Sequence, residues 1–387
     1  MKSEGNIVTS VCIVSHNGYG AISGGKVGFV GGVERQTSLL ARWLADQGYT
    51  VTFLTWDEGG APEEMIDGVR VIKICREDAG LPGLRFFHPR WSGLIAALAI
   101  ADADVYYHNC GECVTGQMAL WCRRNGRPLV FSLASDADCN PALPELHSDR
   151  ERFLYRFGLR KADRRVAQTE TQRESLLLHF GLDSEVIRMP APGPDHFLAP
   201  EPATTKVVWI GRVCRVKRPD RLVEIAKSCP DLRFDVAGPV YDDDYSLRVA
   251  AEADTLSNVR MLGAVPRERV SALYRDASIL CCTSDYEGFP NTFLEAWSHG
   301  LPVVSTVDPD GVITRHGLGR IAADVASLAS EVRFLLADPV AYTTASRNAR
   351  EYYLAHHAME AVMPRFESLF KELANKNVKT PTADEQD

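Results

Sequence analysis

Two carboxylates, Glu287 and Glu295, are the residues of this sequence best placed to do chemistry. The apolar run 279–282 before them predicts a buried strand, and residues 291–298 predict a helix. Glu287 would then follow the carboxyl end of a strand, where an open α/β sheet binds its ligands. Free N–H groups at the start of the helix attract phosphate or sugar oxygens. Glu295 would lie about two turns into the helix, so the two carboxylates could line one site at different depths.

A pair of cations stands in a similar position earlier in the second half of the chain. Arg212 and Lys217 follow Gly211 and the strand-like run 207–210. Arginine offers a fixed fork of donors that suits two phosphate oxygens, and lysine offers a compact charge. A solvated basic loop would explain the charges but not their position at a strand end. The sequence therefore predicts a phosphate-binding loop here.

The first half of the chain opens with a glycine-rich loop between a strand and a helix. Residues 7–15 predict the strand and residues 33–47 the helix. This order lets backbone N–H groups approach a phosphate closely, and Gly31 and Gly32 would make that approach. The G-x-G-x-x-G pattern of a dinucleotide fold is not cleanly present. The glycines have a second interpretation, in which they only turn a surface loop.

Three segments together resemble one enzyme family. Residues 287–295, EGFPNTFLE, resemble the E-x7-E signature of retaining GT-B glycosyltransferases of the GT4 type, also called glycosyltransferase group 1. Residues 31–34, GGVE, resemble the first loop of that family, and residues 211–217 resemble its G-R-x-x-x-x-K segment. The resemblance covers residues 7–370 and is more specific in the second half of the chain.

The resemblance implies a GT-B fold, in which two Rossmann-like α/β domains face each other across a cleft and a C-terminal helix returns to the first domain. The alternation of short apolar strands with amphipathic helices independently predicts parallel βαβ units. The proline-rich stretch from Met189 reads as an interdomain linker. We expect an acceptor-side domain at 1–197, a donor domain at 198–355, the returning helix at 356–374 and a disordered tail at 375–387.

For chemistry, the resemblance implies transfer of a sugar from a nucleotide-sugar donor to a saccharide or lipid-linked acceptor, with retention of anomeric configuration, in cell-surface or exopolysaccharide synthesis. Arg212 and Lys217 would stabilise the departing diphosphate. Glu287 would bind donor-sugar hydroxyls, and Glu295 would accept the ribose hydroxyls. The remaining donor contacts would come from Gly31, Gly32, Gly211, Val265, Gly288, Phe289, Pro290, Asn291 and Thr292.

One position departs from the family pattern. Many members place a histidine directly after the strand that here is predicted at 128–133, and this chain has Ala134 there. Ser135, Asp136 and His108 are candidates for the missing sugar or acceptor contact. Polar residues at strand ends also act as caps and turn formers, so both interpretations stay open.

No required metal or other cofactor is expected. The D-x-D triplets at 136–138 and 308–310 resemble the metal-binding motif of another glycosyltransferase architecture, but in a GT-B chain we interpret them as turns. The ten cysteines are scattered through apolar or mid-helix settings, which is typical of reduced core residues. Cys110 and Cys113 form a C-x-x-C without a second pair at zinc spacing.

Bulk properties limit the partners and the location. The net charge of −8 argues against binding to nucleic acid. We find neither a signal-peptide pattern nor an apolar run that could span a bilayer, so a cytoplasmic location is expected. Residues 150–165 carry seven basic and two acidic side chains on an expected helix. That helix presents either a solvated face or a patch for an anionic acceptor or anionic lipid, which would hold the protein at the inner face of the membrane.

Other functions compatible with this pattern are a non-catalytic GT-B partner subunit and a GT-B nucleotide-sugar epimerase. A partner subunit fits Ala134 and would bind nucleotide without turnover. An epimerase would need additional acid/base carboxylates and histidines, and the segments at 211–217 and 287–295 argue against it. The sequence does not distinguish UDP, GDP and ADP as the nucleotide of the donor.

Overall fold

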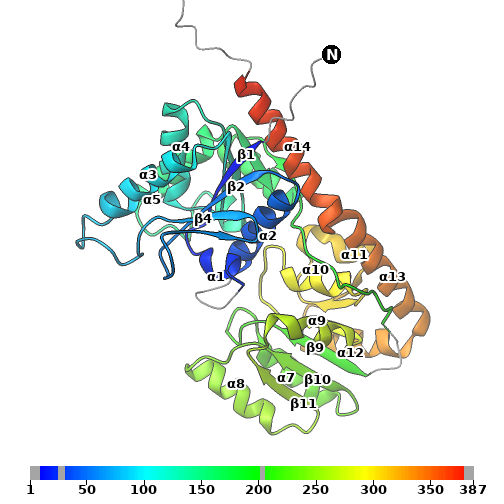
Figure 1. Ribbon diagram of the computed structural model, residues 1–387. Coiled ribbons are helices and arrows are strands. Elements are labelled where there is room, and N and C mark those ends of the chain that lie inside the picture. The colour runs from blue at the N-terminus through cyan, green and yellow to red at the C-terminus, as the bar shows by residue number, and fades with distance from the viewer. Residues whose placement is uncertain (1–8, 25–30, 201–204, 379–387) are drawn as a thin grey trace, which may run out of the picture. The chain divides into compact units, whose positions relative to one another are not determined.

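The computed structural model describes residues 9–24, 31–200 and 205–378 (Figure 1). The chain forms two compact units: unit 1 comprises Met1–Met189 with Met363–Asp387, and unit 2 comprises Pro190–Val362. The sequence placed the first boundary after residue 197, whereas the structural division places residues 190–197 with unit 2.

Unit 1 is built on an eight-stranded sheet with the order β3-β4-β2-β1-β5-β6-β7-β8. Every neighbouring pair is parallel except β3 with β4. The strands are β1 Ser10–Val14, β2 Thr50–Thr55, β3 Glu63–Ile66, β4 Val69–Lys73, β5 Val105–Asn109, β6 Leu129–Ser132, β7 Arg164–Ala167 and β8 Glu185–Val186. The predicted Rossmann-like parallel sheet is therefore confirmed.

Helices flank this sheet. They are α1 Tyr19–Ile22, α2 Gly32–Asp46, η1 Phe86–Trp91, α3 Ser92–Ala101, α4 Cys113–Arg124, η2 Asp136–Cys139, α5 Asp149–Lys161 and α6 Glu170–Phe180. Helices α4 and α5 approach so closely that a Cβ at Gly116 would lie 2.2 Å from the Leu154 oxygen. A Cβ at Gly158 would lie 2.5 Å from the Thr115 carbonyl carbon. The contact therefore requires glycine on both helices.

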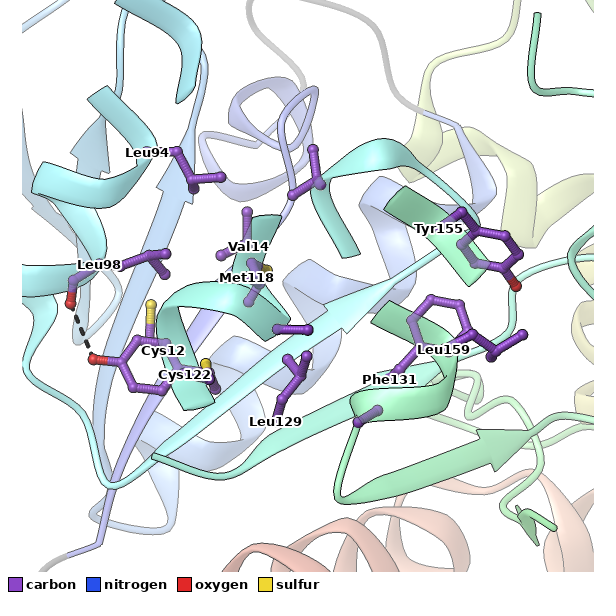
Figure 2. Packing of buried hydrophobic residues seen from close by; sticks show 14 of the residues in the cluster. Cys12, Val14, Leu94, Leu98, Met118, Cys122, Leu129, Phe131, Tyr155 and Leu159 are labelled. Carbon is purple, nitrogen blue, oxygen red and sulfur yellow. Dashed lines mark hydrogen bonds between the residues drawn. The ribbon is translucent and has the colours of Figure 1, made fainter. Parts of the chain in front are cut away.

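The core of unit 1 fills the space between the sheet and α3, α4 and α5 (Figure 2). Cys12 and Leu129 from the strands meet Met118 from α4, and all three are essentially fully buried. The Tyr106 hydroxyl donates to the Leu98 oxygen at 3.0 Å, so the core keeps its polar group paired. All ten cysteines are free thiols.

The last helix, α14 (Met359–Val378), joins unit 1 from Met363 onward. The rings of Phe366 and Phe370 each lie 6.0 Å from the ring of Tyr107 on β5, in edge-on geometry. This is the predicted return of the C-terminal helix to the first unit. The helix includes residues 375–378, which the sequence placed in the tail, and residues 379–387 lie outside the described part of the chain.

Two details of unit 1 differ from the sequence-based expectation. Strand β3 was not predicted, because it is a short edge strand whose side chains are exposed or half-buried and include two glutamates. The basic stretch is not one helix, since α5 ends at Lys161 and Arg164 and Arg165 lie on β7. Arg165 donates to the carbonyl oxygen of Ala162 at 2.8 Å and so is committed to the turn between the two elements.

Unit 2 has a six-stranded, fully parallel sheet with the order β11-β10-β9-β12-β13-β14. The strands are β9 Lys206–Ile210, β10 Arg233–Ala237, β11 Val259–Gly263, β12 Ile279–Cys282, β13 Val303–Ser305 and β14 Gly319–Ile321. The helices are α7 Pro219–Ser228, α8 Asp244–Asp254, α9 Arg267–Arg275, α10 Asn291–Ser298, η3 Pro309–Gly311, α11 Val312–His316, α12 Val325–Ala337 and α13 Pro339–His356. Strand β12 and helix α10 have the predicted bounds.

None of the helices within the described residues combines the length and the apolar composition that crossing a bilayer requires.

The carboxyl ends of β9 and β10 are held together through glycine backbone. The Gly211 N–H donates to the Ala237 oxygen at 2.9 Å, and the next residue, Gly238, has φ +153°. A Cβ on Gly238 would lie only 1.6 Å from the Gly211 oxygen. Because nothing but glycine fits there, the loop that carries Arg212 depends on this contact.

We predict that Gly238→Ala lowers the free energy of unfolding of unit 2 by at least about 3 kcal/mol, because it adds both backbone strain and a clash. Gly263→Ala is the matched control, since Gly263 also has a positive φ but a Cβ there would meet no atom within 4 Å. That variant should cost only about 1–2 kcal/mol. Urea denaturation measures both, and equal losses would contradict the steric explanation.

Candidate functional site

The order of the strands in unit 2 identifies where a ligand would bind. From β9 the chain moves to β10 on one side, and it later returns to place β12 on the other side of β9. Open α/β sheets bind ligands outside the carboxyl ends of the strands at such a switch point. The loops that leave β9 and β12 carry Lys217 and Glu287, two of the four charged residues that the sequence singled out for the donor site.

These two loops are bound to each other by buried hydrogen bonds. The Trp209 Nε1–H donates to Thr283 Oγ1 at 2.9 Å, and that hydroxyl donates to the Lys217 carbonyl oxygen at 2.8 Å. The Asp285 N–H donates to the Val216 oxygen at 2.9 Å. Thr283 and Trp209 are almost completely buried, at 0% and 2% exposure. The loops therefore hold their charged side chains as one unit.

Lys217 and Glu287 form an ion pair at this point. Lys217 Nζ lies 2.5 Å from Glu287 Oε1, and Ser284 Oγ donates to the same oxygen at 2.6 Å. The two charged side chains are 26% and 12% exposed. The structure thus brings Lys217, the cation predicted to bind phosphate, into contact with Glu287, the carboxylate predicted to bind sugar hydroxyls. Both side chains are partly accessible to solvent.

Arg212 differs from its neighbours because its guanidinium has no hydrogen-bond or ion-pair partner among the described residues. Nearby, Arg218 pairs with Asp220 at 2.8 Å, and Arg221 pairs with Asp285 at 2.8 Å. Arg212 is exposed at the end of β9, directly after Gly211. Its five donors are available to an anionic ligand.

Glu295 occupies the second turn of α10, where its residue is 6% exposed. The Tyr274 hydroxyl donates to Glu295 Oε2 at 2.9 Å and so fixes the orientation of the carboxylate. Glu287 thus precedes α10 and Glu295 lies within it, and their lining of one site at different depths stays a prediction.

The residues between the two carboxylates divide into anchors and candidate backbone donors. Phe289 is 9% exposed, and its ring lies 5.3 Å from the His357 ring and 6.1 Å from the Trp297 ring. The side chain of Phe289 therefore holds the loop in place, and only its backbone could reach a ligand. Gly288 is half-buried, as are Asn291 and Thr292, which begin α10.

Helix α10 begins after Pro290 without a side-chain cap from any described residue. The positive end of its dipole therefore points toward the loop that carries Glu287 and favours a negative group there.

Val265 is half-buried in the loop after β11, at the edge of the sheet rather than at the switch point.

The candidate sugar or acceptor residues of unit 1 lie at the ends of two neighbouring strands. His108 is the penultimate residue of β5, with its Nδ1 3.1 Å from Thr115 Oγ1, and burial lowers its pKa to about 3. Asp136 accepts a hydrogen bond from Gln172 Nε2 at 3.1 Å. His108 and Asp136 thus have separate partners. The half-buried Ser135 lies between Ala134 and Asp136 at the start of η2.

Both D-x-D triplets lie in turns that use their carboxylates for backbone contacts. Asp138 accepts from the N–H groups of Ala134 at 2.6 Å and Gly111 at 3.1 Å, and burial raises its pKa to about 6. Asp308 accepts from the Ile313 N–H at 2.7 Å, at the start of α11. Both triplets thus lie at short 3-10 helices, η2 and η3, and the absence of a required metal there stays a prediction.

Gly31 and Gly32 lie at the start of α2, Gly31 as the N-cap and Gly32 as the first residue. The helix has no side-chain cap among the described residues. Burial raises the pKa of Glu34 in the first turn. Most of the glycine-rich loop before them, residues 25–30, lies outside the described residues.

The sequence did not predict a cavity of about 360 Å³ in unit 1. The order of this sheet switches between β1 and β5, and the cavity lies beside the residues that follow both strands. His16, after β1, stacks on Trp56 with ring centroids 3.9 Å apart. The other lining residues are Asn17, Glu77, Phe86, Arg90, Cys110, Gly111, Glu112, Cys113, Val114, Gln117, Glu145, Leu146, His147 and Glu151. The one feature of the sequence that could have indicated this cavity is the position of His16 and Cys110 just after two predicted strands.

We predict that Thr283→Val destabilises unit 2 by about 1–3 kcal/mol, because the buried Trp209 Nε1–H loses its acceptor. In a Trp209→Phe background the same substitution should cost at least about 1 kcal/mol less, since that donor is already absent. Chemical denaturation of the four proteins of this cycle measures the coupling. Additive costs would contradict the assignment of the hydrogen bond as the source.

Comparison with known proteins agrees with this geometry. Residues 31–193 match the model of the "Glycosyl transferase 4-like domain", and residues 204–338 match the model of "Glycosyl transferases group 1". The chain is 29% identical over 208 residues to D-inositol 3-phosphate glycosyltransferase of Pseudarthrobacter chlorophenolicus, a stretch of 47% of this chain and 49% of that protein. It is 26% identical over 231 residues to the protein of the same name from Mycolicibacterium smegmatis, covering 53% of each. The chain thus aligns with about half the length of these relatives.

Solved structures resemble the chain over nearly its full length. Sucrose-phosphate synthase from Thermosynechococcus elongatus superimposes with a TM-score of 0.75 at 20% identity, covering 95% of this chain and 100% of that one. Anabaena HepE in complex with UDP-glucose superimposes with a TM-score of 0.72 at 15% identity, covering 94% and 99%. These similarities show the GT-B fold. With its two parallel-sheet units and matches to both family models, the chain belongs to the group 1 (GT4) glycosyltransferases.

Proposed function

We propose that this glycosyltransferase binds a nucleotide-sugar donor at the switch point of unit 2 and transfers its sugar with retention of configuration. The observation that carries the proposal is the Lys217–Glu287 ion pair, which joins the loops after β9 and β12. The loop after β9 also carries Arg212, whose guanidinium has no hydrogen-bond or ion-pair partner among the described residues. Together these residues offer cations for a diphosphate and a carboxylate for a hydroxylated ring. The structural neighbour HepE binds UDP-glucose, which makes UDP the first nucleotide to test.

The charges suit the departure of a nucleoside diphosphate. As the bond between the sugar and the phosphate loosens, negative charge grows on the phosphate oxygens. Arg212 and Lys217 would stabilise that charge, together with the N-terminal end of α10. These fixed positive groups can perform the work of a divalent cation, so donor binding at this site needs none. The departing phosphate can accept the proton of the acceptor hydroxyl, and no separate strong base is required.

Donor binding would also rearrange the ion pair. A phosphate that attracts Lys217 leaves Glu287 to accept hydrogen bonds from sugar hydroxyls, with Ser284 still donating to its Oε1. Glu295, oriented by Tyr274, would accept the ribose hydroxyls. Because charge-assisted hydrogen bonds are the strong ones, each carboxylate adds specificity for a polyhydroxylated ligand.

For the acceptor we propose the cavity of unit 1. Its stacked Trp56 and His16 offer apolar faces, and Glu112, Glu145 and Glu151 are acceptors for hydroxyl groups. Arg90, also in the lining, could meet a phosphate. This chemistry suits a saccharide or a lipid-linked saccharide with a phosphate, as in cell-surface or exopolysaccharide synthesis at the cytoplasmic face of a membrane.

We predict that Arg212→Ala weakens binding of UDP about 10–100-fold, because it removes charge-assisted hydrogen bonds to phosphate. Binding of uridine, which lacks phosphate, should not change. Arg215→Ala is the matched control, since Arg215 is an exposed arginine of the same loop whose guanidinium lies 5.2 Å from the Tyr245 ring. Isothermal titration calorimetry measures the affinities of the unaltered protein and of both variants for UDP and for uridine.

Three outcomes would overturn parts of this proposal. Equal losses in the Arg212→Ala and Arg215→Ala variants would show that general positive charge, not a phosphate contact, binds the ligand. Selective UDP binding without transfer or hydrolysis of any UDP-sugar would favour the non-catalytic partner subunit, which Ala134 already permits. Turnover that inverts the anomeric configuration, followed by NMR, would contradict retention.

A further inference from the structure

We infer that His108, Cys110 and Glu112 of unit 1 form a binding site for a divalent transition metal of the zinc class. One ligand atom from each residue lies within 4.8 Å of the other two. Within the part of the chain that the structure describes, this is the one group of three such side chains. The inference concerns unit 1 and does not depend on the proposed donor site in unit 2.

The donor set determines the class of ion. An imidazole nitrogen, a thiol sulfur and a carboxylate oxygen suit zinc and related borderline-soft cations, whereas magnesium and calcium prefer oxygen alone. In a tetrahedral zinc site the ligand atoms lie about 3.3–3.6 Å apart, given Zn–N and Zn–S bonds of about 2.0–2.3 Å. The ligand atoms would therefore have to approach one another by at most about 1–1.5 Å on binding. Side-chain rotations in a short loop can supply that.

The residues are held in place by the fold. His108 is the penultimate residue of β5 and is 2% exposed, while Cys110 and Glu112 are half-buried in the turn before α4. Cys110 has φ +87°, which is rare for a residue with a side chain. Its N–H donates to the Ser132 oxygen on β6 at 3.1 Å. The sheet thus holds Cys110 in an unfavourable backbone conformation, in the turn between His108 and Glu112.

Neighbouring side chains supply the outer contacts that metal ligands usually have. Thr115 Oγ1 lies 3.1 Å from His108 Nδ1, which leaves Nε2 as the nitrogen for a metal. His16 Nδ1 lies 3.9 Å from Glu112 Oε2. The His16 side chain is only 9% exposed, and its Nε2 is buried without a hydrogen-bond partner. His16 is therefore an unsatisfied polar group next to Glu112, although it does not belong to the three-residue group.

The site opens on the cavity of about 360 Å³, because Cys110, Glu112 and His16 all line it. An ion bound there with three protein ligands would keep a position for an oxygen of the molecule that occupies the cavity. Cys113 lines the same cavity but does not belong to the three-residue group. It is therefore the matched control for thiol chemistry that does not involve a metal.

The test uses the full chain, freed of metal with EDTA and dialysed. Zinc is titrated in competition with a chromophoric chelator, and cobalt(II) is added separately to record its absorption spectrum. We expect one zinc per chain and a thiolate-to-cobalt charge-transfer band. Cys110→Ser should abolish the band, while Cys113→Ser should retain both the band and the zinc affinity. Thr115→Val should weaken zinc binding about 10–100-fold, as loss of an outer contact does.

Several results would overturn the inference. These are the absence of stoichiometric zinc binding by the unaltered chain, a cobalt spectrum without a charge-transfer band, and zinc binding that survives Cys110→Ser or is lost in Cys113→Ser. The cobalt spectrum of the unaltered chain decides the question even if a variant does not fold. UDP binding measured on the same samples separates the two proposals, because its loss would count against the donor site and not against the metal site.

Discussion

The polar chemistry of unit 2 depends on one buried hydroxyl, that of Thr283. It accepts from the indole of Trp209 and donates to the backbone of Lys217, so it connects the strand beneath the site with the loop above it. Strand β12 brings the hydroxyl there by pairing in register with β9, Leu280 beside Val208. Together with the hydrogen bond from the Asp285 N–H to the Val216 oxygen, this hydroxyl joins the loops that carry Lys217 and Glu287.

Much of the fold could be predicted because buried parallel strands are short apolar runs between turn residues. Helix α10 and strand β12 are the clearest cases, since Pro290 and Gly300 delimit the helix and the strand is an unbroken apolar run of residues 279–282 between polar residues. Helix α8 is not evident from the sequence, because the three aspartates 242–244 at its start are equally typical of an exposed turn, whereas Asp243 accepts from the N–H groups of Tyr245 and Ser246 as an N-cap. A capping aspartate and a turn aspartate have the same sequence signature, and only the hydrogen bonds distinguish them.

The candidate site was predictable where a motif lies within one segment and unpredictable where distant segments meet. The spacing of Glu287 and Glu295 on a loop and a helix followed from local periodicity. The contact of Lys217 with Glu287 did not, because it depends on which strands are neighbours. The cavity of unit 1 was missed for the same reason, since His16 and Glu112 come from the ends of β1 and β5. Side-chain pairing across a sheet requires the strand order, which a single sequence does not contain.

In the proposed donor site, the ion pair between Lys217 and Glu287 favours ligands that carry both phosphate and hydroxyl groups over ligands that carry only one of them. Each partner neutralises the other, so a simple anion that attracts Lys217 leaves a largely buried carboxylate without its counter-charge, which costs free energy. A polyol that bonds only to Glu287 leaves the ammonium in the same state. A ligand that carries phosphate and hydroxyl groups in one molecule compensates both charges at once. In the proposed donor site, the pair would therefore favour ligands that carry both groups over inorganic phosphate or free sugars, which carry only one.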